Sequence, residues 1–209
     1  MKNEKMTSKV FVERVNRLLD KIKIENPDYK SIRLRKGEIK EVIEELLPLR
    51  DFIEEMEKEK GPTSIIYHGK DSIRDATLEI QNDGKQVLGV QVTIATENNE
   101  YLRRQALVEG SPVFFGEIYR DKKTGEIISI PRVFTGDEHI KENAQIIELA
   151  INKKKQFDYG GSCILLVSVE EYDFILDDEW QEVKLLINKN HVPFESVWLR
   201  RRSGQCEKI

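Results

Sequence analysis

The residues with the clearest chemical potential are an acid and an amide on two adjacent segments, Asp75 and Gln91. Residues 75–81 (DATLEIQ) and 86–95 (QVLGVQVTIA) have the composition and spacing of β-strands. The Asn82-Asp83-Gly84 segment between them is typical of a hairpin turn. The two side chains therefore belong to neighbouring strands, where they could hold one metal ion or hydrogen-bond to each other.

The turn also predicts the register of this hairpin. If Gly84 takes the left-handed position of the turn, Gln81 faces Lys85, and each earlier residue of the first strand has a fixed partner on the second. Asp75 then faces Gln91 on the polar side of the hairpin. Facing residues have β-carbons about 4.5–5.5 Å apart, which is close enough for the two side chains to interact directly.

Hydrophobic spacing predicts the elements that must position this pair. A helical N-terminal part is followed by a three-strand meander, and helices and strands alternate after the inserted segment. In chain order we expect a helix over 7–22, a helix over 37–61 that kinks or restarts at Pro48, strands over 64–68, 75–81 and 86–95, a helix over 98–110, a hairpin over 113–131, a long helix from Thr135 to Gly160, a strand over 163–169, a helix over 178–190 and a final strand over 196–200.

This order predicts an α/β fold with a mixed β-sheet, formed by a three-strand meander plus parallel strands and sandwiched by helices. The strand, helix, strand connection after residue 163 implies the parallel pairing. We expect residues 1–36 to form an N-terminal helical extension and 37–209 to form one domain. An inserted helix and β-hairpin arm would occupy about 97–134.

Composition limits the function classes. The 209 residues include 34 Lys and Arg against 38 Asp and Glu, so charge is abundant without a dominating sign. This argues against intrinsic disorder and against DNA binding driven by net positive charge. The charged N-terminus and the lack of an apolar stretch of about 18 residues predict a soluble, cytoplasmic protein with no membrane partner. Two cysteines without CxxC spacing predict neither a disulfide framework nor structural zinc.

The element order over residues 38–169 resembles that of the PD-(D/E)xK, or restriction-endonuclease-like, nuclease superfamily, which is helix, three-strand meander, helix, strand. In that superfamily an aspartate on the second strand and an acid and lysine on the third bind Mg²⁺ and activate the water that cleaves a phosphodiester. The resemblance implies a restriction-endonuclease-like core. It also assigns Asp75 to the aspartate position, with Arg74 where proline often stands, and implies Mg²⁺ or Mn²⁺ as cofactor, with Asp75 and Gln91 as ligands.

The chain departs from the motif at two positions. Gln91 and Thr93 stand where the acid and the lysine are expected; a glutamine carbonyl can bind a hard cation but supplies no charge, and a threonine cannot replace an ammonium. Superfamily members sometimes supply the lysine from the helix after the meander. Lys154 and Lys155 continue its apolar stripe, although lysines are common in the last turn of any helix.

Two further acids could join the site. Superfamily sites often add a glutamate from the helix before the meander, and Glu45 is our choice there, although most glutamates of so acidic a helix are expected to face solvent. Glu79 shares the face of Asp75 and could supply the missing charge, but a solvent-exposed strand acid is the simpler interpretation.

Local basic residues could contact nucleic acid. Arg103 and Arg104 lie on the inserted helix, and Lys122 and Lys123 lie at the tip of the inserted hairpin, which could enter a groove as a two-stranded ribbon. On so charged a surface, each cluster is also what an ordinary solvated face would show.

Three interpretations therefore stay open. The chain is a divergent metal-dependent nuclease acting on DNA in restriction, repair or defence, with Asp75, Gln91, Glu45 and Lys154 or Lys155 at its site. Alternatively, it is a catalytically inactive nuclease-like domain that binds nucleic acid, a protein partner or a second copy of itself. In the third interpretation, the 97–134 arm binds a protein and the sheet is only a scaffold. Fold alone does not decide among them.

Overall fold

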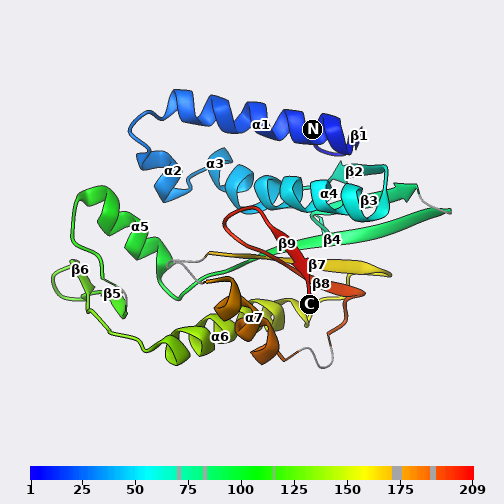
Figure 1. The fold of residues 1–209 in the computed structure, drawn as a ribbon. Helices are drawn as coiled ribbons and strands as arrows, with labels where there is room; N and C mark the ends of the chain where they lie inside the picture. Colours follow the sequence, from blue (N-terminus) through cyan, green and yellow to red (C-terminus); the bar gives the residue numbers. More distant parts are fainter. Residues whose placement is uncertain (70–71, 82–83, 115, 171–175, 189–191) are drawn as a thin grey trace.

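A seven-stranded mixed sheet lies between two layers of helices. In the computed structural model, the described residues are 1–69, 72–81, 84–114, 116–170, 176–188 and 192–209. The strand order is β1-β2-β3-β4-β7-β8-β9. Figure 1 shows α1 and α4 on one side of the sheet and α6 and α7 on the other. The predicted α/β class with a mixed sheet sandwiched by helices is confirmed.

The predicted meander and the predicted parallel strands both belong to this sheet. Strands β2, β3 and β4 pair antiparallel, whereas β4 with β7 and β7 with β8 pair parallel. The strands of the sheet are β1 (Lys5–Thr7), β2 (Thr63–Tyr67), β3 (Ala76–Gln81), β4 (Lys85–Ala95), β7 (Cys163–Val169), β8 (Ser196–Arg200) and β9 (Cys206–Lys208).

Two edge strands were not predicted. β1 and β9 have three residues each, too few for an alternating pattern to stand out, and they form only by pairing with β2 and β8. The expectation that 196–200 is the final strand is therefore wrong.

The first helical layer packs on one face of the sheet. α1 (Ser8–Glu25) is capped by Thr7, whose hydroxyl accepts a hydrogen bond from the backbone N–H of Val10. Its Phe11 and Val15 are fully buried against α4 (Leu47–Lys60) and the sheet. The predicted N-terminal helix therefore contributes directly to the hydrophobic core.

The second helical layer packs on the other face. α6 (Gly136–Lys154) begins with the expected capping box, in which Thr135 and Glu138 satisfy each other's backbone N–H groups. α7 (Asp177–Leu186) packs beside it. Successive residues of β7 enter alternate cores: Ile164 lies in the α4 core and Leu165 in the α6 core. This confirms the prediction of a central strand covered on both faces.

A π-helical turn precedes α4. The short α3 (Glu38–Glu41) leads into η1 (Val42–Leu46), where the N–H of Leu47 bonds to the carbonyl of Val42, five residues back. Pro48 follows in the first turn of α4. A proline has no N–H and its ring clashes with the carbonyl four residues earlier, so the wider turn accommodates Pro48 without breaking the helix.

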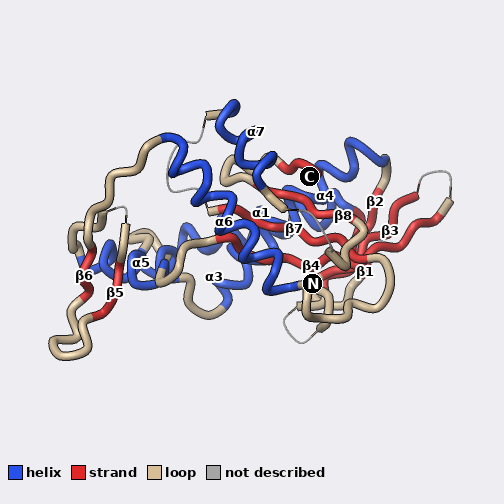
Figure 2. Tube along the Cα trace, turned by 90° about the horizontal axis from the view of Figure 1, so that it is seen from below, coloured by secondary structure: helices blue, strands red, loops and turns tan. Residues whose placement is uncertain are grey.

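The inserted segment forms an arm at one end of the sheet, as Figures 1 and 2 both show. It contains α5 (Glu100–Glu109) and a small separate sheet of β5 (Ile118–Arg120) and β6 (Ile127–Ser129). α5 packs beside α2 (Lys30–Leu34), a short helix that was not predicted.

The predicted hairpin register is confirmed. Gln81 pairs with Lys85, and Ala76 pairs with Val90. Of the turn itself, Asn82 and Asp83 lie outside the described residues, while Gly84 has a positive φ of 138°. No helix in the described part of the chain is long and apolar enough to cross a membrane.

Candidate functional site

Asp75 and Gln91 meet as the register predicts. Asp75 lies just before β3, and its backbone N–H bonds to the carbonyl of Val90 at 3.0 Å. The side-chain amide of Gln91 donates to Oδ2 of Asp75 at 2.5 Å, and the backbone N–H of Val92 donates to the same oxygen at 2.6 Å. Both side chains are buried, with 8% of Asp75 and 7% of Gln91 exposed. The pair is therefore a fixed hydrogen-bonded unit.

Burial changes the acidity of Asp75. Desolvation raises the pKa of its carboxyl from 3.8 to about 6, and the negative charge of Glu45 adds to the rise. The N–H of Val92, the ammonium of Lys154 and the amide of Gln91 act in the opposite direction. Burial and the charge of Glu45 outweigh these three effects, so the Asp75 carboxyl binds its proton more tightly than an exposed aspartate does.

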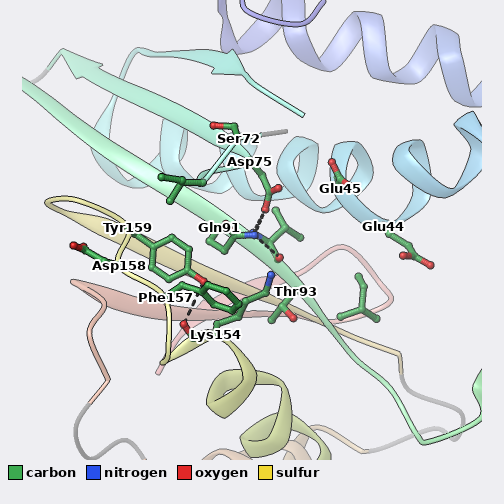
Figure 3. A pocket seen from close by; sticks show the side chains of 13 residues that line it. Glu44, Glu45, Ser72, Asp75, Gln91, Thr93, Lys154, Phe157, Asp158 and Tyr159 are labelled. Atoms are coloured by element: carbon green, nitrogen blue, oxygen red, sulfur yellow. Dashed lines mark hydrogen bonds between the residues drawn. The ribbon is translucent and has the colours of Figure 1, made fainter. Parts of the chain in front are cut away.

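A cavity of about 700 Å³ opens beside this pair (Figure 3). Both helical layers contribute to its wall: Glu44 and Glu45 come from η1, and Lys154 comes from the end of α6. The remaining lining residues come from the segment before β3, from β4 and from the segment after α6; they are Ser72, Ile73, Asp75, Gln91, Val92, Thr93, Ile94, Phe157, Asp158 and Tyr159.

Of the two candidate lysines, Lys154 lines the cavity and Lys155 does not. Lys154 is the last residue of α6, and Figure 3 shows its amine pointing past Thr93 toward Gln91. Its charge acts on the carboxyl of Asp75. The helix thus brings an ammonium to the end of β4 where Thr93 supplies none.

A buried tyrosine, Tyr67, positions the side chain of Glu45 by hydrogen bonding. The hydroxyl of Tyr67 lies 2.7 Å from Oε2 of Glu45 and 2.8 Å from Oε1 of Glu41. A phenol donates one proton, so Tyr67 serves one carboxylate at a time. Burial and these two carboxylates raise the pKa of Tyr67 far above its usual value, which keeps the hydroxyl protonated as a donor.

Arg74 holds the cavity-lining segment after α6, residues 157–159, against the strands. The guanidinium Nε donates to the backbone carbonyl of Tyr159 at 2.6 Å, and the hydroxyl of Tyr159 donates to the carbonyl of Lys154 at 3.2 Å. Arg74 can cross β4 because Gly89 has no side chain: a β-carbon there would lie 2.6 Å from Cδ of Arg74. This anchor was not predicted, although an isolated glycine inside a strand is a known sign of close approach.

The donor set limits how a metal ion could bind. Among the described residues, no group of three or more His, Cys, Asp or Glu side chains is arranged to hold one. Oδ2 of Asp75 is occupied by two donors, so Oδ1 and the nearby Glu45 are the available carboxylate oxygens. Such a set fits Mg²⁺, which often binds through one or two carboxylates plus substrate phosphates and water. It does not fit an ion held by the protein alone.

Charge in the cavity favours cations. Its lining contains the carboxylates of Glu44, Glu45, Asp75 and Asp158 and the ammonium of Lys154; Glu44 also pairs with Arg35 at 3.4 Å, which leaves three carboxylates against one ammonium. A phosphate entering this space meets net negative charge, and a divalent cation would neutralise it.

The other predicted residues lie elsewhere. Arg103 is 3% exposed and pairs with Glu97 at 2.7 Å, and Arg104 pairs with Glu170 at 2.8 Å. Arg103 contacts other residues of the arm, including the backbone carbonyl of Gly116, whereas Arg104 joins α5 to Glu170 in the body of the protein. Lys122 and Lys123 are exposed and do not line the cavity. They belong to the loop between β5 and β6, which lies at the outer end of the arm (Figure 2).

Glu79 does not line the cavity. Its carboxylate lies 2.6 Å from the amine of Lys5 and 3.2 Å from that of Lys85, and both lysines lower its pKa.

Comparison with known proteins does not place this chain in a family. No protein-family model matches it, and neither a curated protein nor a solved structure is significantly similar to it. Its function has to be inferred from the cavity.

Proposed function

We propose that this chain is a divergent metal-dependent phosphodiesterase of the PD-(D/E)xK type that cleaves DNA, in restriction, repair or defence. The observation that carries the proposal is that Asp75, Glu45 and Lys154 line one cavity although they come from three distant parts of the chain. The element order is the one expected for a restriction-endonuclease-like core. Lys154 takes the place of the lysine that Thr93 cannot provide.

The proposed cofactor is Mg²⁺ or Mn²⁺. Oδ1 of Asp75 and the carboxylate of Glu45 would hold the ion together with a substrate phosphate. Gln91 donates to Asp75 and would become a ligand only by turning its amide and giving up that hydrogen bond. When bound, the ion would polarise the phosphate and lower the pKa of a coordinated water.

The side chains of the protein would divide the remaining work. Gln91 and the backbone of Val92 fix the orientation of Asp75. Tyr67 holds Glu45 toward the same space. Lys154 would place positive charge beside the phosphate, where charge develops during displacement, in a site partly shielded from water.

A second candidate function is a nuclease-like domain without catalysis that binds nucleic acid or a protein. One observation favours it. Gln91 stands where the superfamily has its second acid, and Lys154 is the only ammonium among the described residues that line the cavity, so charges that hydrolysis would use are few. The inactive domain would keep the scaffold and the binding surface.

Cleavage assays separate the two functions. Plasmid and single-stranded DNA are incubated with the purified protein in Mg²⁺ or Mn²⁺, beside Asp75→Asn and Lys154→Ala. We expect metal-dependent cleavage that Asp75→Asn abolishes and that Lys154→Ala slows by about 10²–10³. Binding without cleavage by the unmodified protein would support the inactive domain, and cleavage that persists in Asp75→Asn would exclude Asp75 as the catalytic acid.

A further inference from the structure

We infer that the cavity takes an unpaired nucleotide, with its base stacked on Phe157 at the rim, so that the substrate is single-stranded nucleic acid or a frayed end and not an intact duplex. This inference rests on the proposed function for the phosphate chemistry. The stacking itself can be tested without cleavage.

The rim carries two apolar side chains that the core does not use. Phe157 is 52% exposed and Ile73 is 68% exposed, and both line the cavity that holds Asp75. Ile73 lies two residues before Asp75, and Phe157 lies three residues after Lys154. An apolar platform therefore lies beside the charged residues that would receive a phosphate.

Phe157 is the exposed end of a series of aromatic rings. Its ring centroid lies 6.4 Å from that of Tyr159, which lies 5.2 Å from that of Phe194. Tyr159 and Phe194 are buried. The N–H of Phe157 also bonds to the carbonyl of Lys154 at 3.3 Å, so ring and ammonium belong to one turn of the chain. Figure 3 shows Phe157 and Tyr159 close to Lys154 at the same wall of the cavity.

Binding of a nucleic acid in this cavity would need a contribution other than charge attraction, and base stacking can supply it. With Glu44 paired to Arg35, three carboxylates and one ammonium still line the cavity, so a nucleic-acid backbone gains little attraction there without a cation. Stacking of a base on an aromatic ring contributes about 1–3 kcal/mol per base and does not depend on sequence. A base inside a duplex has both faces covered by its neighbours, so only an unpaired base can offer a face to Phe157.

Binding of oligonucleotides to the Asp75→Asn protein tests the inference. Asparagine keeps an oxygen that accepts from Gln91 and Val92, removes one negative charge and blocks cleavage. The probes are a labelled 12-residue single strand, the same sequence as a blunt duplex, and an abasic strand of equal length. We expect the single strand to bind more tightly than the other two.

The second substitution identifies the ring. Phe157→Ala in the Asp75→Asn background should weaken single-strand binding by roughly 5- to 150-fold, the equivalent of one stacked base. It should leave abasic binding unchanged. Phe157→Trp should restore affinity, and its indole fluorescence should be quenched on binding, since Trp180 and Trp198 are buried. Phe114→Ala removes a ring of similar exposure, 45%, from the arm and should have no effect.

Two results would overturn the inference: equal affinity for single strand and duplex, or no loss with Phe157→Ala. Either result could accompany full cleavage by the unmodified protein, in which case the nuclease proposal stands alone. Conversely, a Phe157-dependent preference for single strands in a protein that never cleaves would keep the inference and reject hydrolysis.

Discussion

Gln91 donates its side-chain amide to the buried carboxylate of Asp75, with 2.5 Å between Nε2 and Oδ2. The direction of this hydrogen bond separates the site from one built on two acids. An acid at position 91 would need a proton or a cation between the two carboxylates, whereas the amide satisfies Asp75 without either. The amide of Gln91 and the backbone N–H of Val92 both bond to Oδ2, so Oδ1, which has no donor among the described residues, decides what else the site can bind.

Asp75→Asn should stabilise the protein at neutral pH. The pKa of Asp75 is about 6 in the fold against 3.8 as the ordinary value, so the folded state holds the proton more tightly. The stabilising effect of protonation is complete below pH 3.8 and is lost as the pH rises to about 6. In EDTA at pH 7.5, we expect the variant to exceed the unmodified protein by up to about 3 kcal/mol in unfolding free energy.

This gain should shrink toward zero near pH 4, where both forms are neutral at this position. Urea unfolding at several pH values measures it. A gap of equal size at pH 4 and pH 7.5 would show that charge burial is not its cause.

Gln91→Glu should convert the pair into one that a divalent cation stabilises. Two carboxylates would then face each other in a buried site, so the variant should melt below the unmodified protein in EDTA. Mn²⁺ or Mg²⁺ at ten to one hundred times its dissociation constant for the variant should restore about 1.4–2.7 kcal/mol of the variant's unfolding free energy. The unmodified protein should gain much less.

The double variant Asp75→Asn/Gln91→Glu is the matched control, because it exchanges acid and amide and keeps one of each. Its melting temperature should respond to metal as weakly as that of the unmodified protein. A strong metal response in the unmodified protein would instead mean that the site binds the ion tightly without a second acid at position 91.

Lys154→Ala should reduce cleavage far more than Lys155→Ala. Lys154 lines the cavity and Lys155 does not, and loss of one group that stabilises developing charge costs about 10²–10³ in rate. Lys153→Ala removes an exposed lysine of the same turn and should have no effect. Steady-state rates with saturating DNA and Mg²⁺ measure the comparison, and a larger loss in Lys155→Ala would transfer the role to that residue.

Gly89→Ala should loosen the wall of the cavity. Its β-carbon would displace Arg74 from the carbonyl of Tyr159, which we expect to destabilise the protein by about 1–3 kcal/mol. Gly136→Ala is the control: nothing lies within 4 Å of a β-carbon there, and stability should stay equal or rise. Chemical denaturation measures both variants.

Arg74→Ala should relieve the clash in the double variant Arg74→Ala/Gly89→Ala, so the two destabilisations should not add. Additive losses would show that Gly89 is required for a reason other than the passage of Arg74.

The hairpin was predictable because its determinants are local. A short turn and the alternation of polar and apolar residues fix which residues face each other, and the pairing of Gln81 with Lys85 carries through to Asp75 and Gln91. The same reasoning located α6, because Thr135 and Glu138 form a capping box within four residues.

The rest of the site depends on contacts between distant segments. Arg74 reaches Tyr159 across 85 positions of the chain, and no spacing rule connects them. Lys154 and Lys155 both continued the apolar stripe; only the end of α6 at Lys154 separates them. The pairing of Arg103 with Glu100, by contrast, has helical i,i+3 spacing, so the sequence contained a local sign that this arginine binds an acid.

The π-helical turn η1 sets the directions in which Glu44 and Glu45 point. Successive residues of an α-helix differ in direction by about 100°. Glu45 faces Tyr67 and the cavity, while Glu44 also reaches Arg35 and Arg104 beside the arm, because the chain holds one extra residue in this turn. Deletion of a single codon at position 42 or 43 would let the helix close as a regular α-helix and would rotate α3 relative to α4. Because α2 precedes α3 and packs beside α5, this rotation would move the support of the arm, although no residue that lines the cavity would be replaced.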